Sequence, residues 1–218
     1  ARARRTGWVA AGVLPLLLLA WLLGSSSLLA VRQVVVSGEH RLTAEQIEAA
    51  ADVAPGTPLA RVDTAAVARR VRALGPVASV AVTRGWPHAL RIKVTERVPV
   101  AALTQRRGFL LLDGGGAVIA PVATLPRGTY RLEAPAPDAP ATQAALTVLR
   151  QLPRALRAQL VAVRAATPEQ VTLVLRDGRT VLWGGVDDSP AKAAAVLALM
   201  KMPGTVFDVS APGVVTRR

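Results

Sequence analysis

Hydrophobic and polar residues alternate on both sides of a Trp-Pro step in the stretch SVAVTRGWPHALRIKVTERVPVA, residues 79–101. A period of two on each side of a turn predicts an antiparallel hairpin with one face in a core. The apolar positions are Val80 and Val82 before the turn and Leu90, Ile92 and Val94 after it. The positions expected to face outward are Arg91, Lys93 and Thr95.

The residues before this hairpin predict one strand and two helices. Residues 31–38, VRQVVVSG, are rich in β-branched side chains, which is typical of a strand. Thr43 and Gln46 have the spacing of a capping box and predict a helix that begins there. A second helix is predicted after Asp63 or Thr64, either of which can cap it. The predicted order up to the hairpin is therefore β-α-α-β-β.

The sequence predicts an α+β fold with two domains outside the membrane, residues 32–99 and residues 100–218. We expect the second domain to be a mostly antiparallel sheet with two helices. Its predicted elements are a hairpin around Asp113–Gly116, a proline-rich loop over RLEAPAPDAP, a helix over 141–152, a hairpin with Asp177-Gly178 as a two-residue turn, a helix from Ser189-Pro190 to Met202, and the strand-like TVFDVS and GVVTR.

Residues 6–31 contain no charged side chain and predict a membrane-spanning helix. As a helix this run would extend about 39 Å, which exceeds the hydrocarbon core of a bilayer, about 30 Å. Arg2, Arg4 and Arg5 precede the run, and basic flanks stay in the cytoplasm. Residues 1–5 are therefore expected to end a cytoplasmic tail, with the chain after the run outside the cytoplasm. A cleaved signal peptide is the alternative.

Composition and charge narrow the classes of partner. The chain has no cysteine, so it contains neither disulfides nor thiolate metal sites. Its net charge is +13, of which +10 remains after the three arginines that precede the apolar run. Such a charge suits anionic lipid headgroups, acidic wall polymers or an acidic partner protein. Nucleic acid is not expected as a partner of an exported domain.

No group of residues in the sequence predicts a catalytic, cofactor-binding or metal site. His40 and His88 have no carboxylate or cysteine at ligand spacing, and we expect both to be ordinary surface residues. The glycine run 114–116 lacks the lysine of a phosphate-binding loop and is better explained by a hairpin turn. The basic residues expected to form a solvated helix face are Arg69, Arg70 and Arg72.

Three segments of the sequence match a known pattern: VVVSGEHRLTAEQI, VASVAVTRGWPHALRIKVTERVPVA and GFLLLDGGGAVI. In these segments the chain resembles the FtsQ/DivIB family of bacterial cell-division proteins. It implies that residues 32–99 form a POTRA domain, a small module used for protein contacts. The residues of the domain hairpin and junction are Trp86, Pro87, Glu96, Arg97 and Pro99. We expect Trp86 to pack where the hairpin turns and Pro99 to mark the end of the first domain.

The resemblance also implies a function. It implies a non-enzymatic divisome scaffold in the cell membrane at the septum, which binds the single-span proteins FtsB (DivIC) and FtsL and needs no cofactor. By family position the partner would add a strand at a sheet edge. The residues expected there are Thr205, Val206, Phe207, Asp208, Val209, Ser210, Val214, Val215 and Arg217.

Three alternatives remain open from the residues alone. Phe207 and Val209 could simply be core residues, because alternation does not distinguish an edge strand from an interior one. The chain could instead be an anchored POTRA protein of envelope transport or assembly, although it lacks the long series of amphipathic strands that a barrel needs. An anchored envelope enzyme is the third alternative, disfavoured because no acid-base or metal cluster is evident.

Overall fold

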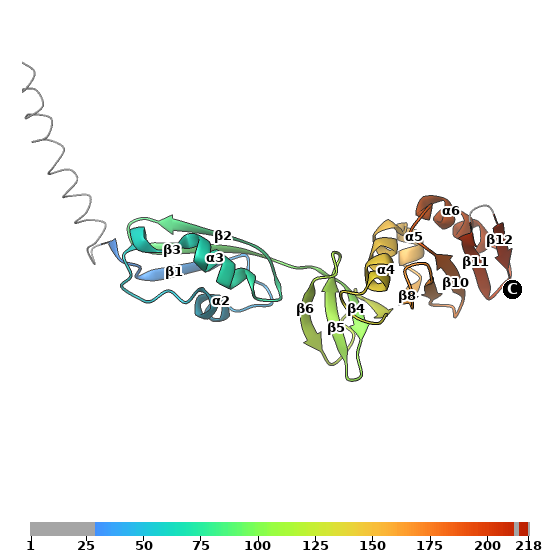
Figure 1. Ribbon diagram of the computed structural model, residues 1–218, viewed down its shortest axis with the longest axis horizontal. Helices are drawn as coiled ribbons and strands as arrows, with labels where there is room; N and C mark the ends of the chain where they lie inside the picture. Colours follow the sequence, from blue (N-terminus) through green and yellow to red (C-terminus); the bar gives the residue numbers. More distant parts are fainter. Residues whose placement is uncertain (1–28, 212–213, 218) are drawn as a thin grey trace, which may run out of the picture. The chain divides into compact units, whose positions relative to one another are not determined.

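The computed structural model describes residues 29–211 and 214–217. The backbone forms two compact units, and the boundary between them falls between Glu96 and Arg97 (Figure 1). Most of the predicted membrane helix, residues 6–31, lies outside the described residues. The last residues of this predicted helix are described, and two of them, Ala30 and Val31, are buried in the first unit. Within the described part of the chain, no helix is long and apolar enough to cross a membrane.

The first unit has the predicted β-α-α-β-β order, with one additional short 3-10 helix. Its elements are β1 (Gln33–Ser37), α2 (Ala44–Ala51), η2 (Leu59–Arg61), α3 (Thr64–Arg72), β2 (Val77–Gly85) and β3 (Ala89–Glu96). The sheet order is β1-β3-β2, and β1 runs parallel to the central strand β3. The predicted hairpin is confirmed as the antiparallel pair of β2 and β3.

The core of the first unit lies between this sheet and its two helices (Figure 1). The predicted inward residues of β3 are all buried: Leu90 and Ile92 are 0% exposed and Val94 is 2% exposed. They pack with Ile47 of α2 and with Val67 and Val71 of α3. The residues predicted to face outward, Arg91, Lys93 and Thr95, are exposed. The predicted register of the strand is therefore confirmed.

Both predicted helix starts in the first unit are confirmed. Thr43 and Gln46 form the capping box, in which each side chain bonds the backbone N–H of the other residue. Asp63, one of the two candidates, caps α3 by accepting hydrogen bonds from the N–H groups of Ala65 and Ala66. These bonds satisfy donors that a helix start otherwise leaves unpaired.

The second unit contains one large sheet with helices packed on it. Its elements are β4 (Pro99–Thr104), β5 (Phe109–Asp113), β6 (Val118–Val122), β7 (Tyr130–Glu133), α4 (Pro140–Gln151), α5 (Arg154–Arg157), β8 (Leu160–Ala165), β9 (Val171–Leu175), β10 (Thr180–Gly184), α6 (Ser189–Leu199), β11 (Val206–Ala211) and β12 (Val214–Arg217). The nine described strands follow the order β12-β11-β10-β9-β8-β7-β4-β5-β6. Five neighbouring pairs are antiparallel and three are parallel, so the sheet is mostly antiparallel as expected.

The prediction for this unit missed several elements. β7 begins at Tyr130 and includes the first residues of the segment predicted to be a proline-rich loop. β8 was not predicted, and neither was the short helix α5, so the unit has three described helices instead of two. Strands β7 and β8 are parallel neighbours, and β4 pairs in parallel with β7. Such pairings join segments that are far apart in the chain, so local patterns do not reveal them.

Two turns differ in detail from the prediction. The β9–β10 loop has three residues, because Leu175 and Arg179 face each other and Gly178 has a φ of +85°. This is a type I turn followed by a left-handed glycine, not the predicted two-residue turn. Helix α6 begins at Ser189 as expected, but its N-cap is Asp188, and the Ser189 hydroxyl does not cap the helix.

Both faces of the sheet are buried where β4 and β5 lie. Ala101 and Leu103 of β4 belong to the main core, which α4 and α6 cover. Ala102, between them in sequence, belongs to a smaller cluster on the opposite face with Leu111 and Ile119. Since successive side chains of a strand point to opposite faces, β4 has buried side chains on both faces of the sheet.

Candidate functional site

The carboxy-terminal corner of the sheet is formed by β10, β11 and β12. β11 pairs in parallel with β10, and Val181 lies opposite Phe207. On its other side β11 pairs with β12 in the antiparallel direction, and Phe207 lies opposite Arg217. β12 is the last described strand at this end, so its outer side has no strand beside it in the described part of the chain. The free backbone edge therefore belongs to β12.

Two of the predicted binding residues have their side chains in the core. Phe207 is 0% exposed and Val209 is 2% exposed, and both belong to the main hydrophobic cluster. Thr205 and Ser210, which flank the buried stretch, are exposed, and Asp208 is partly buried. The structure thus decides between core and edge for this strand: β11 is interior, and Phe207 and Val209 contact the core.

A buried tryptophan in β10 packs in the main core at this corner. Trp183 of β10 is 0% exposed, and its indole Nε1 donates to the Ser189 hydroxyl at 3.3 Å. The same hydroxyl donates to the carbonyl of Val186 at 2.8 Å. Lys192 of α6 is only 7% exposed, and its Nζ donates to the carbonyl of Gly185 at 3.0 Å. These bonds connect α6 to the end of β10 and fix the position of the strand against which β11 is built.

Two carboxylates near the corner have hydrogen-bond partners within the unit. Arg179 forms an ion pair with Asp177 at 2.6 Å, donates to the carbonyl of Met200 at 2.9 Å, and lies over the ring of Phe207. Asp208 accepts from the hydroxyl and the N–H of Ser210, and these hydrogen bonds hold the pKa of Asp208 below its ordinary value. These contacts stabilise the ends of β10 and β11, next to which β12 is the terminal strand of the described sheet.

The junction residue Glu96 fixes a loop of the first unit. Its carboxylate accepts hydrogen bonds from three successive backbone N–H groups, those of His40, Arg41 and Leu42, at 2.8–3.1 Å. Burial alone would raise the pKa of Glu96, but these bonds outweigh it, and the pKa lies below its ordinary value. The end of β3 is thereby tied to the loop that precedes α2.

Its neighbour Arg97 forms an ion pair in the second unit. Arg97 donates to Asp113 at 2.6 Å, and Asp113 also accepts from the N–H groups of Gly115 and Ala117. Burial would raise the pKa of Asp113, but the Arg97 bond and the backbone bonds lower it overall. Pro99 is the first residue of β4 and lies opposite Asp113. The Glu-Arg-Val-Pro sequence thus combines two different anchoring interactions within four residues.

The prediction that Trp86 packs at the hairpin turn is wrong. Trp86 is 54% exposed, and the peptide bond between Trp86 and Pro87 is cis. The core beneath the hairpin is filled by residues of the strands and helices, including Leu59 of η2.

We expect Glu96→Gln to destabilise the first unit at neutral pH and to do so less as the pH falls. The folded-state pKa of Glu96 is lowered, so the stability it contributes is present above its ordinary value of 4.5 and is lost as the pH falls through the folded-state pKa. Urea unfolding of the wild type and the variant at several pH values measures this difference. Glu48→Gln, at an exposed position of α2, is the control. A Glu96→Gln effect that does not change with pH would contradict the expectation.

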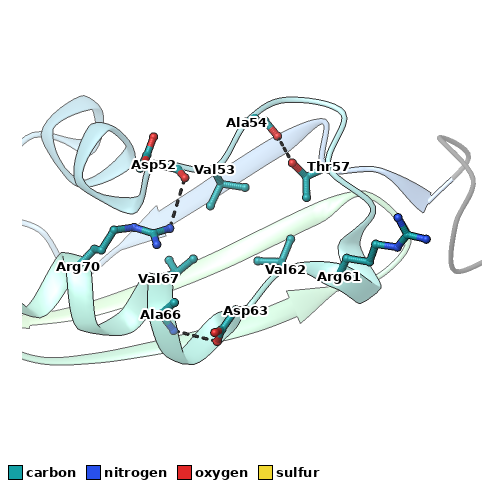
Figure 2. Close-up of a pocket in the computed structure, with 10 residues that line it drawn as sticks. All are labelled: Asp52, Val53, Ala54, Thr57, Arg61, Val62, Asp63, Ala66, Val67 and Arg70. Atoms are coloured by element: carbon teal, nitrogen blue, oxygen red, sulfur yellow. Dashed lines mark hydrogen bonds between the residues drawn. The ribbon is translucent and has the colours of Figure 1, made fainter.

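A cavity of about 340 Å³ lies between the end of α2 and the start of α3 (Figure 2). Its polar groups already serve the fold. Arg70 donates to the carbonyls of Ala51 and Asp52 at the end of α2, so it is not the merely solvated residue that we expected. Asp63 caps α3 across the cavity. These contacts explain the polar lining without a ligand.

The described residues contain no group of three or more metal-ligating side chains. Both histidines form hydrogen bonds through backbone atoms. The N–H of His40 donates to the Glu96 carboxylate, and the carbonyl of His88 accepts from the N–H groups of Arg32 and Gln33. The outer edge of β12, which has no neighbouring strand among the described residues, is the kind of edge to which another chain can add a strand.

Comparison with known families matches both units. Residues 29–97 match the family model described as "POTRA domain, FtsQ-type". Residues 101–209 match the model described as "Cell division protein FtsQ/DivIB, C-terminal". The first match covers the β-α-α-β-β unit, and the second extends from β4 into β11.

Curated relatives extend over most of the chain. A protein of Mycolicibacterium smegmatis named "Cell division protein FtsQ" is 41% identical over 197 residues, which are 89% of this chain and 59% of that protein. A protein of the same name from Streptomyces bingchenggensis is 40% identical over 204 residues, 88% of this chain and 77% of that protein. The solved extracytoplasmic domain of DivIB from Geobacillus stearothermophilus is 21% identical, with a match that covers 50% of this chain and 98% of that chain and a TM-score of 0.37.

Proposed function

Because the chain belongs to the FtsQ/DivIB family of bacterial cell-division proteins, we propose that it is a non-enzymatic divisome scaffold. In this role it binds small single-span division proteins of the FtsB/DivIC and FtsL type and links them to septal wall synthesis. Residues 6–29 of the uncharged run anchor it in the cell membrane, and the two units that follow, divided between Glu96 and Arg97, lie outside the cytoplasm.

The observation that supports a binding role is the accessible edge of β12. A strand edge offers backbone N–H and C=O groups at regular spacing, and another chain can add a strand to it. Phe207 and Val209 hold β11 in the core, so the edge strand β12 pairs with a strand whose position is fixed. Arg217, at the end of β12, adds a positive charge that favours an acidic partner.

A pair of proline substitutions tests the edge. Successive residues of a strand direct their N–H groups to opposite sides, so one of Val215→Pro and Thr216→Pro removes a bond to β11 and the other removes a donor from the free edge. We expect one variant to lose partner affinity at least about tenfold, or about 1.4 kcal/mol, with the unfolding of the second unit unchanged. Co-purification of the full chain with its single-span division partners, followed by titration, measures the affinity.

Two further variants complete the design. Arg217→Ala is expected to slow association and to reduce its salt dependence, because a charge at the rim acts mainly on encounter. Proline at Val209 is unsuitable as a probe, since that strand is interior and the substitution would disturb the core. Full partner affinity in both β12 proline variants would place the binding site elsewhere in the chain.

A further inference from the structure

The turn between β2 and β3 lies beside the residue at which the first unit begins. The carbonyl of His88, in this turn, accepts hydrogen bonds from the N–H groups of Arg32 at 3.0 Å and Gln33 at 3.3 Å. β1 runs parallel to β3, so both strands start at the same end of the sheet (Figure 1). The hairpin turn therefore lies at the end of the unit that is nearest in sequence to the uncharged run.

A second segment meets the chain at the same end. The N–H of Val31 donates to the carbonyl of Thr57 at 2.8 Å, and the N–H of Gly56 donates to the carbonyl of Val31 at 3.1 Å. Ala30 forms a β-bridge with Pro58. Since Ala30 and Val31 are each 3% exposed, the folded unit begins directly after Leu29, and only the stretch GSSSLL, residues 24–29, separates it in sequence from the apolar residues that precede Gly24.

The side chains gathered at this end are one exposed tryptophan and several arginines. Trp86 is 54% exposed at the tip of the turn. The guanidinium of Arg84 donates to the carbonyls of Leu59 and Val62, at 2.9 and 2.7 Å. A Cβ at Gly85 would lie 3.1 Å from the guanidinium of Arg91, so the side chain of Arg91 extends along the hairpin toward the turn.

The charged side chains of the segments that meet here are all arginines, and Asp63, directly after Val62, caps α3. Arg32 and Arg61 are exposed there in addition to Arg84 and Arg91. The segments that meet, residues 29–33, 56–62 and 83–91, contain no aspartate or glutamate. An exposed indole at an end of the unit that also carries exposed arginines, with no acidic residue in these segments, fits a surface with an apolar interior and anionic groups at its boundary. The boundary of a bilayer with anionic headgroups has this character.

We propose that this end of the first unit docks on the outer surface of the membrane, with Trp86 in the headgroup region and the arginines on lipid phosphates. Tryptophan is favoured at membrane interfaces because its ring is largely apolar and its N–H is polar. Guanidinium groups bind phosphate with two hydrogen bonds at once. The proposal rests on the membrane anchoring that we propose above, because a short connection to the anchor would hold the turn near the headgroup region, about 5–8 Å deep.

The test uses two matched labelling sites in the same hairpin. The chain has no cysteine, so Thr83→Cys and Thr95→Cys each give a single site for an environment-sensitive fluorophore. Both threonines are exposed, and they lie opposite Arg91 and Ser79 respectively. Thr83 is near the turn, whereas Thr95 lies about 13 Å farther along β3. The labelled full chains are reconstituted into vesicles of phosphatidylcholine with phosphatidylglycerol that carry a spin label on some headgroups.

We expect quenching of the Thr83 label to be several-fold stronger than that of the Thr95 label. Adding Trp86→Ala to Thr83→Cys should reduce this difference, as should vesicles of phosphatidylcholine alone or the double variant Arg32→Gln and Arg91→Gln. Trp86→Ala acts on the insertion of the ring, whereas the other two changes act on the attraction to phosphates. Rising salt should weaken the same difference.

Vesicle flotation separates the two proposals. If the chain floats with the vesicles but both labels remain unquenched, the anchor holds and the docking of the turn is overturned. If both labels are quenched equally, contact at the hairpin turn is overturned as well. A chain that fails to float overturns the anchor and the docking that depends on it. Quenching at neither site together with co-purification of a protein that requires Trp86 would assign the turn to a protein partner instead.

Discussion

Trp183→Ala is expected to cost the second unit about 3–5 kcal/mol of its free energy of unfolding. The indole is 0% exposed in the main core, and its removal leaves a cavity between β10 and α6 and deprives the Ser189 hydroxyl of a donor. Because β11 pairs with β10, the loss should also loosen β11 and the edge strand beyond it. Urea unfolding of the full chain in detergent, followed by circular dichroism, measures the cost.

The neighbouring Leu182 provides the control for this prediction. Leu182 lies in the same strand on the opposite face and is 36% exposed, so Leu182→Ala should cost about 1 kcal/mol or less. Peptide-resolved hydrogen exchange would show whether the destabilisation is confined to the second unit. Equal costs at the two positions would contradict the interior role of Trp183.

Ile92→Ala is expected to cost the first unit about 2–5 kcal/mol, whereas Lys93→Ala should change its stability by less than about 0.5 kcal/mol. Ile92 is 0% exposed on the central strand and packs under α2 and α3. Lys93, the next residue, is exposed on the other face of the sheet. Protection of the β3 amides from hydrogen exchange is the direct measure, because it reports this unit separately from the other. Similar losses at both positions would mean that the register of β3 is different.

The first unit could be predicted because its signals are local. The capping box of Thr43 and Gln46 needs only four consecutive residues, and the alternation of Leu90, Ile92 and Val94 is contained within one strand. The family resemblance agreed with these patterns. The exposure of Trp86 was not predicted, since a large aromatic at a turn is expected to pack unless the surrounding core is already complete.

The second unit was harder to predict because its sheet depends on distant pairings. β7 begins at Tyr130 directly before a proline-rich segment, and its neighbours β4 and β8 are separated from it by hairpins and helices. The proposed site shows the same limit. Alternation in residues 205–210 was recognised, but only the pairing of β11 with both β10 and β12 shows that its apolar residues are interior and that the edge lies one strand farther on.

The order of the strands at the carboxy-terminal corner has a consequence for the biogenesis of the protein. β12 pairs with β11, and β11 reaches its place beside β10 only after the intervening α6 has crossed the sheet. Synthesis proceeds from the amino terminus, and domains tend to fold in that order. The first unit can therefore be folded while the ribosome is still adding α6 and β11. If partners dock on β12, a chain whose synthesis has not yet reached β12 cannot recruit them, so partner binding would select chains in which the second unit has formed.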